Sequence, residues 1–306
     1  MIKKSFLSLL IISTLIVLTV GGYLSYQLYK HKYTTLDPKL KEVSGIEFDK
    51  RGNLWAINDG GDGPFLYQVD EKGKIAKRIE VTNAKNIDWE DMTQNEFGHF
   101  FLGDFGNNKN NRRWLTIYKI ENPIDIKGDT TEAEIIKFTY KDLWDAPVTP
   151  DRKNFDLEAF VEYKHHLYLF TKNRTSPFDG KTNLYRIGNH ADNYEAHFIS
   201  SFETCTTAEK LCWITSSAMS PDRSKLALLD STDLWLFDSW QGDDFFSGNV
   251  QKINLGIVTQ KEAVTFYDNN TVVIADEEFK GIGRNVYVFK LDEQVLQKVE
   301  LKTVDQ

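Results

Sequence analysis

The 306-residue sequence lacks most of the motifs by which enzymes and nucleic-acid-binding proteins are recognised. Its net charge is −8 and it has no basic stripe, which argues against a nucleic-acid partner because phosphate contacts need clustered Lys and Arg. Its six histidines form no cluster that would suggest zinc. It also has no glycine-rich phosphate loop and no Gly-x-Ser-x-Gly nucleophile motif. Its 41% hydrophobic and 27% charged residues are an ordinary balance for a globular chain.

The longest stretch without a charged residue lies near the start of the sequence and includes residues 6–24. Nineteen such residues are enough to cross a bilayer as a helix, and longer than a usual signal-peptide core. We therefore predict that residues 1–32 are a membrane anchor and linker, followed by one domain over 33–306. The domain would lie outside the cytoplasm, in the periplasm or extracellular space, on a single-pass protein of the cell membrane. A cleaved signal, with Val20-Gly21-Gly22 as the cleavage region, is the alternative and would give a secreted protein.

Cysteine is scarce, and the two that occur, Cys205 and Cys212, are neighbours in the sequence. In an oxidising compartment such a pair commonly forms a disulfide, which we predict here. Two unrelated buried thiols are the alternative.

One pattern recurs five times and dominates the rest of the chain. A polar or very small residue enters a short apolar strand, and a second apolar strand follows and ends on a polar residue 13 or 14 positions later. The five entry residues are Gly45, Glu90, Glu158, Ser217 and Glu262. The five polar ends are Asn58, Asp104, Thr171, Asp230 and Asp276.

A third strand in each unit has one aromatic residue at an equivalent place, and a more polar fourth strand closes most units. The aromatics are Tyr67, Tyr118, Tyr185, Trp235 and Tyr287. Repeated four-stranded units of this length are typical of propeller blades. We therefore predict an all-β protein, a β-propeller of five four-stranded blades, with six as the alternative. Residues 295–301 would be the last fourth strand, and residues 33–43 would either link the anchor or add a closing strand.

The entry residues and the polar ends should lie together at one mouth of the central channel. Converging carboxylates repel unless protons or a cation compensate, and oxygen ligands suit Ca²⁺. The predicted metal ligands are Glu90, Asp104, Glu158, Glu262 and Asp276. Asn58, Thr171 and Asp230 are the further polar residues predicted at this mouth. Three alternatives stay open: solvated acids, acids paired with Lys172, Arg174 and Lys261, and turn caps that accept backbone N–H groups.

Several motifs resemble those of exported bacterial propellers, namely the SdiA-regulated family and the phytase-like esterase propellers. They are Asn53-Leu54-Trp55-Ala56-Ile57-Asn58-Asp59-Gly60-Gly61, Asp88-Trp89-Glu90-Asp91 and Gly103-Asp104-Phe105-Gly106-Asn107-Asn108. The resemblance spans about residues 40–290. It implies a propeller in which, as in lactonase-type propellers, acidic and amide side chains hold a divalent cation. By blade position Glu90, Glu158, Asp104 and Asp276 match that arrangement.

Two functions follow as expectations. The first is an extracytoplasmic binding module for a small molecule or a protein partner, attached to the membrane through residues 1–32. The second is a Ca²⁺-dependent hydrolase of an ester, phosphoester or lactone, in which the cation polarises the substrate and Glu158 acts as the base. The segment from Asp59 to Gly63 has calcium-loop composition without the full loop, and we interpret it as a mobile turn.

Overall fold

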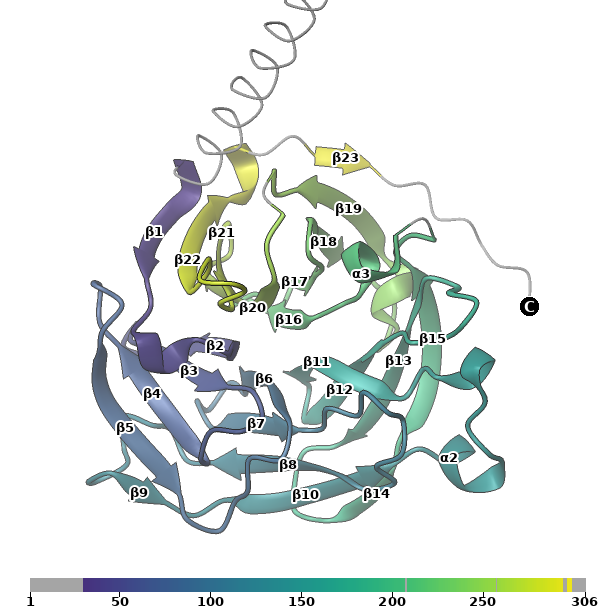
Figure 1. Ribbon diagram of the computed structural model, residues 1–306, viewed down its shortest axis with the longest axis horizontal. Helices are drawn as coiled ribbons and strands as arrows, with labels where there is room; N and C mark the ends of the chain where they lie inside the picture. Colours follow the sequence, from purple (N-terminus) through teal and green to yellow (C-terminus); the bar gives the residue numbers. More distant parts are fainter. Residues whose placement is uncertain (1–29, 207, 257, 294–295, 299–306) are drawn as a thin grey trace, which may run out of the picture.

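The computed structural model describes residues 30–206, 208–256, 258–293 and 296–298. Five sheets stand around one central axis, so the predicted five-bladed β-propeller is confirmed and the six-bladed alternative is wrong for the described chain (Figure 1). The innermost strands of adjacent blades contact one another around a closed ring.

Each blade has four antiparallel strands, numbered here from the axis outward. Blade one is β2 (Val43–Phe48), β3 (Leu54–Asn58), β4 (Phe65–Val69) and β5 (Ile75–Val81). Blade two is β6 (Trp89–Gln94), β7 (Phe100–Asp104), β8 (Leu115–Ile120) and β10 (Glu134–Thr139). Blade three is β11 (Asp156–Tyr163), β12 (His166–Lys172), β13 (Lys181–Gly188) and β15 (His197–Glu203). Blade four is β16 (Ser216–Met219), β17 (Lys225–Leu229), β18 (Asp233–Asp238) and β19 (Asn249–Asn254). Blade five is β20 (Lys261–Asp268), β21 (Thr271–Asp276), β22 (Asn285–Lys290) and β1 (Lys32–Thr35).

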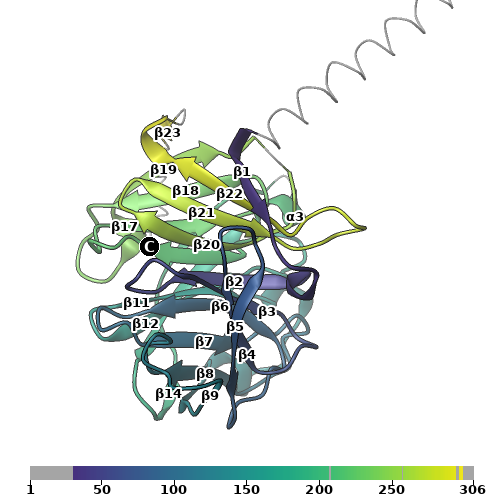
Figure 2. The same ribbon diagram turned by 90° about the vertical axis from the view of Figure 1, so that its left-hand side faces the viewer.

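The ring is closed by the strand that comes first in the described chain. β1 pairs antiparallel with β22, with Lys32 opposite Tyr287 and Thr35 opposite Asn285 (Figure 2). Of the two alternatives for residues 33–43, the closing strand is therefore correct. The expected fourth strand at 295–301 is wrong, because its described part, β23 (Leu296–Lys298), pairs with β19 of blade four instead.

Short segments complete the outer edges and the connections. β9 (Thr130–Thr131) and β14 (Asn193–Glu195) add parallel to β5 and β10, so each ties one blade to its predecessor. Helical turns are few and short among the described residues: η1 (Pro38–Leu40), α2 (Asp142–Asp145), η2 (Pro150–Arg152), α3 (Glu209–Cys212), η3 (Phe245–Ser247) and η4 (Leu291–Glu293). None of these is long and apolar enough to span a bilayer, and the predicted anchor, residues 6–24, falls outside the described residues.

The core consists of five apolar clusters, one between each pair of adjacent blades. Alternating strand residues point to opposite faces of a sheet, so each blade contributes one face to each of two clusters. The five third-strand aromatics are each at most 6% exposed, as their equivalent positions predicted. Burying such rings stabilises the propeller, because each removes a large apolar area from water.

Candidate functional site

Bulges mark the start of four of the five inner strands. The strand register shifts at Ser44, Glu90, Glu158 and Glu262, so each of these residues is an extra residue relative to its partner strand. A bulge redirects the side chain of the extra residue away from its normal position in the sheet. The three glutamates are therefore bulge residues that occupy one equivalent position at one end of the ring.

The register also corrects two entry positions by one residue. Gly45 lies opposite Ile57, which makes it the equivalent of Asp91, and Ser44 takes the equivalent place to Glu90. Blade four has no bulge at this point, so Ser217 has no counterpart among the bulge glutamates.

The polar ends of the second strands do lie beside the entry residues, but their contacts are those of turn caps. Asp276 accepts hydrogen bonds from the backbone N–H of Asn285 (2.6 Å) and the hydroxyl of Tyr287 (2.8 Å). Asp230 caps its turn in the same way and accepts the indole N–H of Trp235 at 2.9 Å. These carboxylates hold the third strands in place, which corresponds to the turn-cap alternative.

The remaining polar ends have similar partners. Asp104 accepts from Asp88 N (3.0 Å) and from Arg112 Nη2 (3.1 Å). The hydroxyl of Thr171 donates to Asn154 at 2.6 Å. The side-chain amide of Asn58 donates to the carbonyl of Lys39 and to Asp62.

Three other carboxylates come together at the channel mouth. One oxygen each of Asp59, Asp88 and Glu90 lies within 4.8 Å of the others. Glu90 is 6% exposed and accepts no hydrogen bond from any described residue. Gly106 borders the group so closely that any side chain there would collide with the carboxylates of Glu90 and Asp88. We call Asp59, Asp88 and Glu90 the acidic triad.

Blade three brings two cations to the mouth, and both are paired with carboxylates. Lys172 Nζ lies 2.9 Å from Glu158 Oε1, and Arg174 lies 3.5 Å from the same oxygen while it also pairs with Asp156. The ring of Trp213 covers both cations, 5.3 Å from Lys172 Nζ and 4.7 Å from Arg174 Cζ. The predicted pairing alternative therefore holds for Glu158.

A disulfide stands directly before that tryptophan. Cys205 and Cys212 are bonded, with their Cα atoms 5.5 Å apart, and the hydroxyl of Thr204 donates to the carbonyl of Cys212 at 2.8 Å. The bridge closes the short loop that ends at Trp213, so it restrains the backbone next to the Lys172 and Arg174 pair.

The acids of the mouth influence one another strongly. Burial raises the pKa of Asp59 to about 7, helped by the nearby charges of Asp88 and Glu158. Burial also raises the pKa of Glu90 well above its usual range, with Glu158 the next cause. The pKa of Glu262 rises to about 8 through burial, against the opposing effect of Lys172.

The channel mouth contains more carboxylates than Lys and Arg side chains. The interacting acids are Asp59, Asp88, Glu90, Asp156, Glu158, Glu262 and Glu277. The cations beside them are Lys172, Arg174 and Arg112. A half-buried group of this composition holds protons or takes up a cation, because ionising all of its members in low dielectric is costly.

Two members of the acidic triad were not among the predicted ligands. Asp59 belongs to the segment interpreted as a mobile turn, and Asp88 precedes its entry glutamate by two positions. Both lie in loops rather than at the repeated strand positions, so the repeat could not indicate them. Their one sequence signal is that both fall within the motifs that carry the family resemblance.

Below the mouth, Asp91 is a further buried acid on the inner strand of blade two. Asp91 is fully buried and accepts hydrogen bonds from the backbone N–H of Phe160 and of Ser217, and from the hydroxyl of Ser216 (3.1 Å). Ser216 in turn accepts from Val264 N. This network joins the inner strands of blades two, three, four and five.

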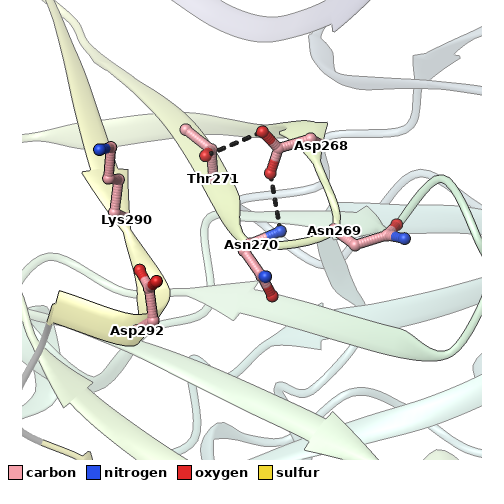
Figure 3. A pocket seen from close by; sticks show the side chains of 6 residues that line it. All are labelled: Asp268, Asn269, Asn270, Thr271, Lys290 and Asp292. Atoms are coloured by element: carbon pink, nitrogen blue, oxygen red, sulfur yellow. Dashed lines mark hydrogen bonds between the residues drawn. The ribbon is translucent and has the colours of Figure 1, made fainter.

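A hollow of about 430 Å³ at the outer rim has no comparable chemistry. It lies at the β20–β21 turn, where Asp268 caps the backbone N–H of Asn270 and accepts from the hydroxyl of Thr271 (Figure 3). Asp268, one of the two acids that line it, therefore maintains a turn.

Comparison with known proteins adds little beyond the architecture. No protein-family model matches the chain, and no curated protein matches it. The family resemblance drawn from the motifs therefore stays a prediction. The fold and the mouth together define a five-bladed β-propeller with an acidic channel mouth.

Solved structures similar to this chain include three enzymes. Virginiamycin B lyase from Staphylococcus aureus is 14% identical, with a TM-score of 0.40 over 85% of this chain and 69% of that one. PQQ-bound aldose sugar dehydrogenase from Streptomyces coelicolor is 11% identical, with a TM-score of 0.46 over 85% and 96%. A gluconolactonase from Xanthomonas campestris is 12% identical, with a TM-score of 0.41 over 81% and 71%. Likenesses at this level carry no argument about activity.

Proposed function

We propose that this propeller is a binding module that holds a divalent cation of the Ca²⁺ type in the acidic triad and, through that cation, an anionic ligand. The observation that supports it is Glu90, a buried carboxylate that accepts no hydrogen bond from the described chain and faces two further carboxylates within 4.8 Å. Ca²⁺ takes six to eight oxygens, so three carboxylates would leave coordination positions open for a ligand.

The neighbouring cations support the choice of an anionic ligand. Lys172 and Arg174 pair with Glu158, are covered by Trp213, and act by their charges on Glu90 and Asp88. An anionic ligand bound to the Ca²⁺-type ion could contact the positive charges of Lys172 and Arg174 with its opposite end. The proposed ligand set differs from the predicted one, since Asp276 caps a turn, Asp104 pairs with Arg112 and Glu158 pairs with Lys172.

Thermal melting tests the proposal. Binding that is selective for the native state stabilises it by about 2.7 kcal/mol at a hundredfold excess over Kd, which corresponds to about 5 °C for a domain of this size. We expect Ca²⁺ to raise the melting temperature of the wild type and of Glu203→Gln, an exposed matched control, but not of Glu90→Gln. An unchanged wild-type melting curve in Ca²⁺ and in chelator would refute it.

A second candidate function is hydrolysis of an ester, phosphoester or lactone. The observation in its favour is Glu262, whose carboxyl has its pKa raised to about 8 by burial and could exchange a proton near neutral pH. Glu158 suits that role less, because Lys172 and Arg174 already hold its charge. A panel of nitrophenyl acetate, nitrophenyl phosphate and a γ-lactone with Ca²⁺ tests it. Turnover should disappear in Glu262→Gln, and binding of Ca²⁺ without any turnover would leave only the binding module.

We further propose that the domain works outside the cytoplasm, attached through residues 1–32 or released after cleavage. The uncharged run at 6–24 and the bonded pair Cys205–Cys212 support this. Protein isolated from its native compartment should react with alkylating reagents at both cysteines only after reduction. Free thiols at both positions before reduction would contradict it.

A further inference from the structure

The channel has a second mouth at the end opposite the acidic triad. Four of the five inner strands end here around a cavity of about 410 Å³. Its wall comes from the ends of β2, β6, β16 and β20 and from the turns that follow β2, β6 and β16. We call it the far mouth. Asp91 and its hydrogen bonds lie between it and the triad.

An arginine in an unusual backbone conformation borders the far mouth. In the hairpin turns of blades one and two, Gly52 (φ 80°) and Gly98 (φ 86°) donate to the carbonyl three residues earlier. Arg223 takes that place in blade four with φ 62°, a left-handed conformation that glycine adopts at lower cost. Its guanidinium bonds Glu162 of blade three and the carbonyl of Gln94 in blade two. Strain of this kind is commonly kept where the side chain has a task.

Two polar groups that line the cavity lack full partners. The hydroxyl of Thr93, on a residue 3% exposed, forms no hydrogen bond with any described residue. Glu47 accepts from Thr265 Oγ1 (2.7 Å) and Phe48 N (2.9 Å), both at one oxygen, and the side-chain amide of Gln94 also favours its ionised form. Among the described residues no Lys or Arg forms an ion pair with Glu47, although the charge of Arg223, which pairs with Glu162, lowers the pKa of the Glu47 carboxyl.

We propose that the far mouth binds a small primary ammonium ion that carries an apolar group, with the ammonium on Glu47 and Thr93. The apolar group would lie against Phe48 and Tyr267, whose rings meet edge to face at 5.3 Å while Tyr267 is 61% exposed. Carboxylate and hydroxyl oxygens accept the N–H groups of an ammonium, and aromatic faces attract its charge. This site is independent of the function proposed for the acidic triad.

The charge around the cavity agrees with a cationic ligand. Burial raises the pKa of Glu47 to about 7, with the hydrogen bond from Thr265 as the largest opposing cause. The other charged groups facing it are Asp49, Lys50 and Glu96 from the turns after β2 and β6, besides Arg223 from the turn after β16. With Arg223 paired, acids exceed bases, so an ammonium would restore the ionised form of Glu47 and should bind more tightly as the pH rises from 6 to 8.

Calorimetric titration of the full-length protein with phenethylammonium at pH 8 tests the proposal, with phenylethanol as the uncharged probe of the same shape. We expect phenethylammonium to bind at least tenfold more tightly than phenylethanol. Glu47→Gln should weaken phenethylammonium binding at least tenfold, and Thr93→Val by a smaller factor. The matched control is Glu96→Gln, an exposed carboxylate on the same rim, which should change binding less than threefold.

Circular dichroism shows whether each variant is folded, so that lost binding is not lost structure. The proposal is overturned if phenylethanol binds as tightly as phenethylammonium, if folded Glu47→Gln binds like the wild type, or if neither probe binds the wild type at 10 mM.

Discussion

The ammonium of Lys172 lies 2.9 Å from a carboxylate oxygen of Glu158, and both side chains are almost completely buried. With Arg174 beside it, this pair neutralises one side of the channel mouth. Among the described residues, no Lys or Arg forms an ion pair with Asp59, Asp88 or Glu90, although the charges of Arg112 and Arg174 act on Asp88. The mouth is thus divided into a paired half and an unpaired half, and the proposed cation belongs to the unpaired half.

Replacing Lys172 should be costly because it leaves buried carboxylates without their cation. Removing one partner of a buried pair typically costs about 3–5 kcal/mol. Lys172→Met should therefore lower the free energy of unfolding by about that much in chemical denaturation at pH 8. The exposed pair Lys41–Glu42, at 3.4 Å, gives the control, since Lys41→Met should cost at most about 1 kcal/mol. Equal small losses in both variants would contradict the division of the mouth.

When divalent metal ions are removed by a chelator, the free energy of unfolding should fall as the pH rises. Acids whose pKa is lowered by folding would give the opposite dependence. The folded-state pKa values of Asp156, Asp59 and Glu262, at about 6, 7 and 8, lie above the values of the unfolded chain. Folded protein therefore holds protons that unfolded protein has released, and stability falls as the pH rises from about 4 to about 8. In chelator the melting temperature should be several degrees lower at pH 8 than at pH 5.5. Ca²⁺ should reduce that difference, because it replaces the protons.

A melting temperature that stays constant or rises over this range in chelator would show that these acids are already compensated in the folded chain. Glu262→Gln isolates one contribution, because it removes a group whose pKa is raised. That variant should be less sensitive to pH than the wild type.

Two truncated chains test whether the closing strand β1 stabilises the propeller. Residues 32–35 pair with β22, and Leu36 behind them is 1% exposed. A chain that starts at residue 30 should melt cooperatively close to the full-length protein. A chain that starts at residue 37 should lose several kcal/mol, since it leaves the edge of β22 unpaired and removes a core side chain. Equal melting of the two truncations would mean that β1 does not close the ring.

The repeat predicted the number of blades because every blade needs the same entry, turn and third-strand aromatic to pack against its neighbours. Tyr67 and Trp235, far apart in sequence, were equivalent on that basis and are equivalent in the structure. The closing strand was left open because local spacing does not indicate that Lys32 pairs with Tyr287.

The site was predicted less fully than the fold. A bulge adds one residue without changing the apolar pattern, so the equivalence of Ser44 rather than Gly45 to Glu90 could not be read from the spacing. The strand-end acids looked like ligands because the sequence does not show the Tyr287 hydroxyl or the Trp235 indole that they bind. Asp59 was missed because loop residues lie outside the repeat.

Calorimetric titration of Ca²⁺ into chelator-treated full-length protein measures directly whether the acidic triad binds a cation. We expect one ion per chain, with affinity at least tenfold weaker in Glu90→Gln and in Asp88→Asn, and nearly unchanged in Asp276→Asn, which alters a turn cap. Absence of binding heat with Ca²⁺, Mg²⁺ and Mn²⁺ at 1 mM, or wild-type affinity in a folded Glu90→Gln variant, would contradict it.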